Sequence, residues 1–159
     1  MDNSLNISDI FSHDQNFQMI MKNMLQTALD NSFDGVMITE AGPGFPIIYV
    51  NPAFCQLSGY TIHELLGKSP AMLQGEKSDQ NVLAELKETI EKGDVFHGRT
   101  INYRKNGDEF LMEWKIVPIR NDDDEIFHYL AIQREVSDDK LDCDSPGSQL
   151  PFSQSQPPE

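Results

Sequence analysis

The pattern of hydrophobic and polar positions changes its period along the chain, and each period predicts a type of element. Between about residues 16 and 31, apolar residues recur at spacings of three and four, which predicts an amphipathic helix. Its apolar stripe is rich in methionine, which suits adaptable packing surfaces. The stripe fits two arrangements: packing on the helix's own domain, or forming the seam of a homodimer. It consists of Phe17, Ile20, Met21, Met24, Leu25 and Ala28.

Runs that are rich in β-branched and aromatic residues predict five strands, two short and three long. Asn106-Gly107, between the third and fourth runs, favours a tight hairpin turn because both residues tolerate positive φ. We therefore expect an α+β fold with a five-stranded antiparallel sheet. The strands are expected at residues 35–39, 47–50, 96–104, 109–119 and 125–136.

Start and stop signals between the second and third strands predict short helices. Pro52 ends the second strand, because proline has no amide proton to donate to a ladder. Thr61 followed by Glu64 has the pattern of a capping box for a brief helix. Ser78-Asp79 precedes a longer helix at residues 80–92. These helices are expected to cover one face of the sheet.

Composition divides the chain into three parts. Residues 1–28 are expected to form an N-terminal extension with the amphipathic helix, and residues 29–138 to form the domain. From residue 139 to residue 159, Asp, Ser, Pro and Gln dominate. Such a stretch buries too little apolar area to offset the entropy of ordering, so we expect this acidic tail to be disordered.

Charge and cysteine content exclude several classes of function. The chain has a net charge of −14, with 26 acidic and 12 basic residues and no cluster of Lys and Arg. Binding to nucleic acid or to anionic membranes is therefore not expected. No apolar run has the length of a membrane span, and no signal-peptide pattern opens the chain. Two distant cysteines, Cys55 and Cys143, indicate a reduced, cytoplasmic protein.

The sequence has no pattern typical of catalytic or metal-binding residues. Its four histidines are scattered, and Ser, His and Asp form no nucleophile motif. The helix at residues 80–92 has no histidine that could bind haem. The acidic run at residues 122–125 lacks the alternating spacing of a calcium loop and is typical of a solvated turn. We expect neither an enzyme nor a metal site.

Several segments resemble a known sensory family. Residues 49–54 (YVNPAF), 58–60 (SGY) and 64–68 (ELLGK) resemble the first half of a PAS domain, a fold that cups a ligand or chromophore against one sheet. Residues 73–75 (LQG) and 101–107 (INYRKNG), with Ile132-Gln133, resemble the light-oxygen-voltage (LOV) branch of that family, which binds a flavin. The resemblance implies a PAS fold that holds FMN or FAD noncovalently.

The resemblance also implies which residues would contact the flavin. Asn102 and Gln133 would read the polar edge of the ring from adjacent strands, because a carboxamide both donates and accepts hydrogen bonds. Lys87 aligns with an arginine that holds the flavin phosphate in the family, and it keeps the charge without the bidentate geometry. The ring faces would rest on Met37, Leu73, Met112 and Ile132, and the remaining candidates are Thr39, Ser69 and Gln74.

Three departures from the LOV pattern change the expected chemistry. The adduct-forming cysteine of the branch falls at Pro70, which has no nucleophile. The arginine that follows that cysteine is Ala71 here, and the second asparagine is Met112. A covalent flavin–thiol photocycle is therefore not expected. The chain is similar instead to cysteine-free, flavin redox-sensing PAS domains of nitrogen-fixation and methane-oxidation regulators, which Glu113 and residues 96–98 also resemble.

The favoured interpretation is a redox or blue-light sensor without a cysteinyl adduct, in which light-driven electron transfer from a tyrosine or Trp114 replaces adduct formation. Rotation of the Gln133 amide would carry the signal through the last strand to the N-terminal helix. The output would pass to a homodimer partner and to a separate signalling protein. Two alternatives stay open: a chromophore-free PAS module for dimerisation or protein interaction, and a receptor for a small metabolite.

Overall fold

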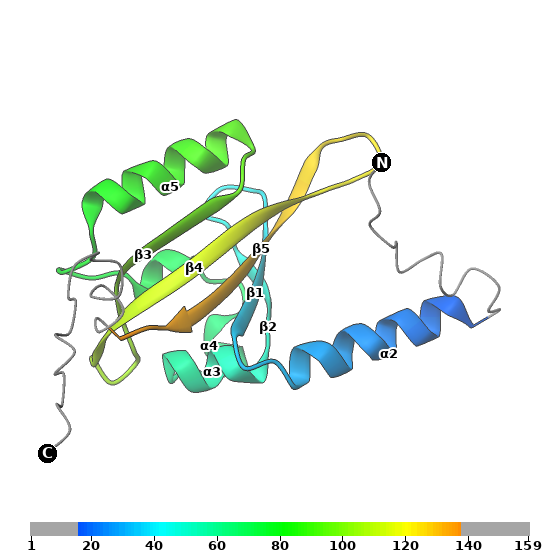
Figure 1. Cartoon of the computed structure of the whole chain (residues 1–159), viewed down its shortest axis with the longest axis horizontal. Helices are drawn as coiled ribbons and strands as arrows, with labels where there is room; N and C mark the ends of the chain where they lie inside the picture. Colours follow the sequence, from blue (N-terminus) through cyan, green and yellow to red (C-terminus); the bar gives the residue numbers. More distant parts are fainter. Residues whose placement is uncertain (1–15, 138–159) are drawn as a thin grey trace, which may run out of the picture.

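The computed structural model describes residues 16–137, and within them the chain forms one antiparallel sheet with helices packed beside it (Figure 1). The five strands lie side by side in the order β2-β1-β5-β4-β3. The predicted α+β fold with a five-stranded antiparallel sheet is confirmed. The strands are β1 (Gly35–Glu40), β2 (Ile47–Val50), β3 (Phe96–Tyr103), β4 (Glu109–Arg120) and β5 (Ile126–Glu135).

Four helical elements connect β2 to β3: the three that the start and stop signals predicted, and a 3₁₀ helix that they did not. Thr61 and Glu64 form the predicted capping box of α4, in which the Thr61 backbone N–H donates to Glu64 Oε2 at 2.9 Å. Asp79 caps α5 by accepting from the N–H groups of Asn81 and Val82. The elements are α3 (Pro52–Ser58), α4 (Ile62–Leu65), the 3₁₀ helix η1 (Pro70–Leu73) and α5 (Gln80–Lys92).

The hairpin between β3 and β4 differs from the tight turn that Asn106-Gly107 predicted. Only Gly107 has positive φ, at 90°, and its N–H donates to the Arg104 carbonyl at 2.9 Å. The central residues of the turn are therefore Lys105 and Asn106. The Asn106 side chain accepts from the Asp108 N–H at 3.0 Å, a local bond that stabilises an ordinary turn at this position.

Asn51 is a buried junction between three elements. Its side-chain oxygen accepts from the N–H groups of Val36, at 2.8 Å, and Phe54, at 3.0 Å. Its side-chain nitrogen donates to the carbonyls of Leu29, at 3.0 Å, and Asp34, at 3.1 Å. Asn51 is fully buried, so these bonds hold the last turn of α2, the start of β1 and the start of α3 together without help from water.

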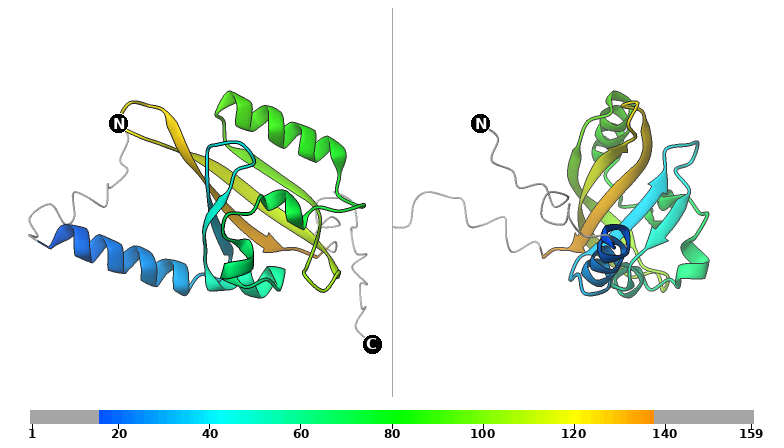
Figure 2. Two further views of the ribbon diagram at one scale, coloured as in Figure 1. Left: turned by 180° about the vertical axis from the view of Figure 1, so that it is seen from behind. Right: turned by 90° about the vertical axis from the view of Figure 1, so that its right-hand side faces the viewer.

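The N-terminal helix, α2 (Phe17–Asp30), projects from the domain and has no buried residue (Figures 1 and 2). No residue of its methionine-rich stripe is buried, and Met24 and Leu25 are exposed by 40% and 59%. Of the two arrangements expected for this stripe, packing on its own domain is not found in the structure. None of the helices within residues 16–137 is long and apolar enough to cross a membrane. Cys143 and the predicted disordered tail lie outside the described residues.

The hydrophobic core consists of two clusters that flank an open space. One is built around β1, β2 and the helices that follow β2, and it includes Met37, Phe54 and Leu73. The other is built on β3 and β4 and consists of Phe96, Phe110, Met112 and Trp114. Ile116 packs against both clusters, and the space between them is the cavity described below.

We predict that Gly75→Ala destabilises the domain by about 1–3 kcal/mol, the usual cost of overpacking. A Cβ atom at this position would lie 2.2 Å from the Tyr103 ring. The ring cannot move away freely, because the Tyr103 hydroxyl accepts a hydrogen bond from the Lys77 N–H at 3.0 Å. Urea denaturation measures the change. Gly42→Ala is the control, since nothing lies within 4 Å of a Cβ there, and equal stability of the two variants would contradict the prediction.

Candidate functional site

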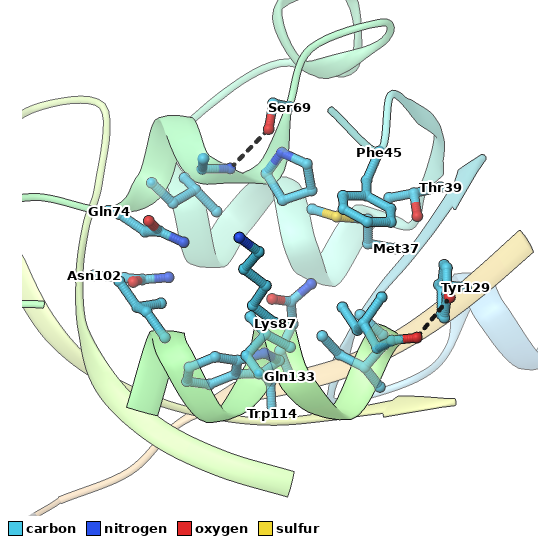
Figure 3. A pocket seen from close by; sticks show the side chains of 18 of the residues that line it. Met37, Thr39, Phe45, Ser69, Gln74, Lys87, Asn102, Trp114, Tyr129 and Gln133 are labelled. Atoms are coloured by element: carbon cyan, nitrogen blue, oxygen red, sulfur yellow. Dashed lines mark hydrogen bonds between the residues drawn. The ribbon is translucent and has the colours of Figure 1, made fainter. Parts of the chain in front are cut away.

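A cavity of about 390 Å³ lies between the sheet, η1 and α5 (Figure 3). Its size falls within the range of cavities that hold small ligands, and its lining is mainly apolar. Nine of the ten candidate residues from the sequence line this cavity, although they come from six different elements and the two residues that flank η1. They are Met37, Thr39, Ser69, Leu73, Gln74, Lys87, Asn102, Met112 and Gln133.

Two buried amides supply the cavity with hydrogen-bonding atoms that have no partner. Asn102 and Gln133 are each only 3% exposed. The Asn102 nitrogen makes a weak bond to Met112 Sδ at 3.3 Å, whereas Asn102 Oδ1 and Gln133 Nε2 have no partner among the described residues. A buried polar atom without a partner costs free energy, so these atoms indicate a ligand with a polar edge that both accepts and donates.

The two amides do not lie on adjacent strands, which corrects the geometry expected from the sequence. Asn102 on β3 pairs with Phe110 of β4, and Gln133 on β5 pairs with Trp114 of β4. β4 therefore lies between them in the sheet. A ligand that bonds to both amides must cross β4, whose Met112 and Trp114 line the cavity between them.

Ile132 was expected to contact the flavin ring, and this prediction is wrong. Its side chain is 37% exposed and does not line the cavity. Successive residues of a strand point to opposite faces, so the inward direction of Ala131 and Gln133 turns Ile132 outward. The same alternation places Glu113 outside the cavity, where it accepts hydrogen bonds from Arg99, and the guanidinium of Arg99 lowers the pKa of Glu113.

Several lining residues were missed in the sequence. Trp114 and Ile116 follow Met112 at every second position along β4, so they share its face of the sheet. Tyr129 and Ala131 precede Gln133 in the same way along β5. Strand periodicity was therefore the signal that would have found all four residues. Phe45 lies in a loop with positive φ and packs on Tyr129 at 5.7 Å between ring centroids. No sequence pattern indicates that contact. The other missed residues are Leu83, Leu86, Ile90 and Glu91 of α5, whereas Pro70 and Ala71 of η1 line the cavity where the resemblance placed them.

No cysteine among the described residues lines the cavity. Pro70 occupies the wall where the resemblance places a reactive thiol. Cys55 packs against the first core cluster instead, and burial raises the pKa of its thiol, which keeps it protonated and a poor nucleophile. Within residues 16–137, no three His, Cys, Asp or Glu side chains gather as metal ligands would.

The PAS domain family matches residues 33–138, and the chain belongs to that family. A nitrogen fixation regulatory protein of Klebsiella oxytoca is 32% identical over 111 residues, which cover 70% of this chain and 22% of the relative. A blue-light photoreceptor of Listeria innocua is 35% identical over 122 residues, which cover 76% of this chain and 46% of the relative. The chain thus spans between about a fifth and a half of these two relatives.

Solved structures confirm the resemblance to the LOV branch. A light-oxygen-voltage domain studied with a flavin analogue superposes with a TM-score of 0.69 at 30% identity. The superposition covers 76% of this chain and 90% of that one. The predicted family and fold are therefore confirmed, and the chain is a PAS domain homologous to blue-light photoreceptors.

Proposed function

We propose that the cavity binds the isoalloxazine ring of a flavin noncovalently and that the domain senses redox state or blue light without forming a thiol adduct. The observation that carries the proposal is the pair of unpartnered amide atoms, Asn102 Oδ1 and Gln133 Nε2, on a mainly apolar cavity. An isoalloxazine ring matches this arrangement, because it combines apolar faces with an edge of alternating donors and acceptors. The similarity to a light-oxygen-voltage domain studied with a flavin analogue supports the same ligand class.

Polar residues of the cavity would bind the edge of such a ring, and apolar residues would contact its faces. Asn102 Oδ1 is free to accept a hydrogen bond, and Gln133 Nε2 is free to donate one. Met37, Leu73 and Trp114 are buried and would exclude water from the ring faces. When bound, the flavin supplies a ring that absorbs blue light and accepts electrons.

Gln133 connects the cavity to the N-terminal helix. It pairs with Gly35 at the start of β1, and Asn51 fastens that start to the last turn of α2. Gln133 lines both the cavity and a surface groove that also includes Phe33 and Asp34, which lie between α2 and β1. A carboxamide can present either its oxygen or its nitrogen. Rotation of the Gln133 amide would therefore pull on β5 and β1 and be transmitted to α2.

The decisive experiment is an absorption spectrum of the full chain as purified and again after addition of flavin, in the dark and under blue light with a reductant. A structured blue-absorbing band that bleaches and returns in air supports the sensor. A thiol adduct would form under blue light without an added reductant, whereas this domain is expected to bleach lastingly only when a reductant is present. A colourless protein that no flavin changes would overturn the proposal and favour a chromophore-free interaction module.

Trp114 provides an internal reporter for this binding. It is the single tryptophan of the chain, it is 5% exposed and it lines the cavity. We predict that its emission falls in a saturable manner as flavin is added, because the ring would lie against the indole. The denatured chain with the same flavin concentrations corrects for absorbed light. A decrease that never saturates would show that flavin does not occupy the cavity.

As output, we propose a homodimer formed through α2 and the sheet, which acts on a separate signalling protein. Met24 and Leu25 of the α2 stripe are exposed, and so is Ile132 on the outer face of β5. Two copies could cover these apolar surfaces reciprocally, as a two-fold interface requires. Sedimentation of the full chain is expected to show a dimer, and Leu25→Glu a monomer. Asn23→Glu, away from the stripe, is the matched control, and a monomeric parent chain would contradict the prediction.

A further inference from the structure

The exposed rim of the cavity offers little attraction for a phosphate group. Its lining contains one cation, Lys87, and one anion, Glu91, which lie one turn apart on α5. Both side chains are exposed, and Lys87 forms no ion pair within the described residues. Exposed charges interact weakly because water screens them, and the Glu91 carboxylate opposes the attraction that Lys87 exerts on an anion.

Backbone donors in and next to η1 are absent or already bonded at this rim, and Figure 3 draws one such bond, to the Ser69 hydroxyl. Pro70 has no N–H. The Ala71 N–H donates to Ser69 Oγ at 3.3 Å, and the Met72 N–H donates to the Ser69 carbonyl at 3.1 Å. The Gln74 N–H donates to the Ala71 carbonyl at 3.0 Å. A phosphate at this rim would therefore find these backbone donors absent or already bonded.

The buried end of the cavity has the opposite character. Asn102 and Gln133 carry the unpartnered polar atoms, and both lie on the sheet far more deeply buried than the rim. Hydrogen bonds there form out of water, where an unmade bond is most costly. In addition, the net charge of −14 repels a dianionic phosphate at any distance that salt does not screen.

We infer that this cavity selects its ligand by the flavin ring and not by the phosphate, so that the chain binds riboflavin about as tightly as FMN or FAD. The inference rests on the proposed function. Lys87 alone is expected to favour FMN over riboflavin by about fivefold or less, the range of an exposed ion pair. Raising the ionic strength is expected to change the affinity for FMN by no more than about this factor, because salt screens exposed charges whose attraction and repulsion are already weak and opposed.

The test is a titration of the flavin-free full chain with riboflavin, FMN and FAD, followed by Trp114 emission and by flavin fluorescence. The parent chain is expected to give three dissociation constants within about fivefold of one another. Ala71→Arg adds a cation at the rim and is expected to tighten FMN binding without tightening riboflavin binding. Ala71→Gln, which has a similar length and no charge, is the matched control and is expected to leave the ratio of the two constants unchanged.

The outcomes separate the inference from the function on which it rests. If the parent chain binds FMN more than tenfold tighter than riboflavin, the inference is overturned and flavin binding stands. An unchanged FMN-to-riboflavin ratio in Ala71→Arg would also overturn it, because the phosphate would then lie away from this rim. If no flavin binds, the proposed function itself fails. A tighter FMN complex in Ala71→Arg alone, beside comparable affinities in the parent chain, supports the inference.

Discussion

Gln133→Leu is expected to stabilise the unliganded domain and at the same time to weaken flavin binding. Gln133 Nε2 is buried without a partner, so the folded state without ligand carries a desolvation cost of about 1–3 kcal/mol that leucine removes. The same substitution takes a hydrogen bond away from the bound ring, which is expected to cost about 1–3 kcal/mol, or about 5- to 150-fold in affinity. Effects of opposite sign are the signature of a residue kept for binding.

Two measurements check this expectation: the urea midpoint of the flavin-free protein and the dissociation constant for riboflavin. Gln56→Leu is the matched control, because Gln56 is an exposed glutamine on α3. It is expected to change the free energy of unfolding by no more than about 0.5 kcal/mol. If Gln133→Leu lowers the stability of the flavin-free domain, the Gln133 amide has a partner inside the protein, and the argument for a ligand at this position fails.

Asn51→Leu is expected to destabilise the domain by about 3–5 kcal/mol. The substitution removes four side-chain hydrogen bonds at once. The Phe54 N–H keeps only its bond to the Asn51 carbonyl at 3.2 Å, and the carbonyls of Leu29 and Asp34 keep only their bonds from Ser32, at 3.4 Å and 3.0 Å. Leucine also places a branched side chain where a fully buried amide fits. The free energy of unfolding, measured in urea, is the readout.

Asn81→Leu is the control for Asn51→Leu. Asn81 is an exposed residue in the first turn of α5, and its side chain has no hydrogen bond within the described residues. Asn81→Leu is therefore expected to change the free energy of unfolding by no more than about 0.5 kcal/mol. A comparable loss in both variants would show that the junction between α2, β1 and α3 contributes no more than a surface position. The Asn51 bonds would then be redundant with packing around Phe54.

Elements with strong local signals could be predicted from the sequence. The capping box of Thr61 and Glu64 and the Asp79 cap of α5 depend on residues three positions apart or less, and both were found as predicted. The β4–β5 and β3–β4 hairpins follow from alternation and turn residues. The β3–β4 turn itself was wrong in detail, because the local bond between Asn106 and Asp108 decides its geometry and a dipeptide rule does not include that bond.

The order of the strands could not be predicted in the same way. β1 pairs with β5 across most of the domain, with Gly35 opposite Gln133, and no local pattern encodes that pairing. Asn102 and Gln133 were wrongly expected on adjacent strands because the strand order could not be predicted. The direction of Ile132 was a different kind of error, since strand periodicity alone would have excluded it once Gln133 was placed inward.

The division of the core into two clusters affects how strongly the stability of the protein, and therefore its resistance to proteolysis, depends on ligand. A ring in the cavity would touch Met37 and Leu73 on one side and Met112 and Trp114 on the other, and so would join the clusters into one continuous core. A ligand at one hundred times its dissociation constant adds about 2.7 kcal/mol to the free energy of unfolding. Proteases act on the unfolded fraction, so the abundance of this chain would rise and fall with the supply of vitamin from which its ligand is made.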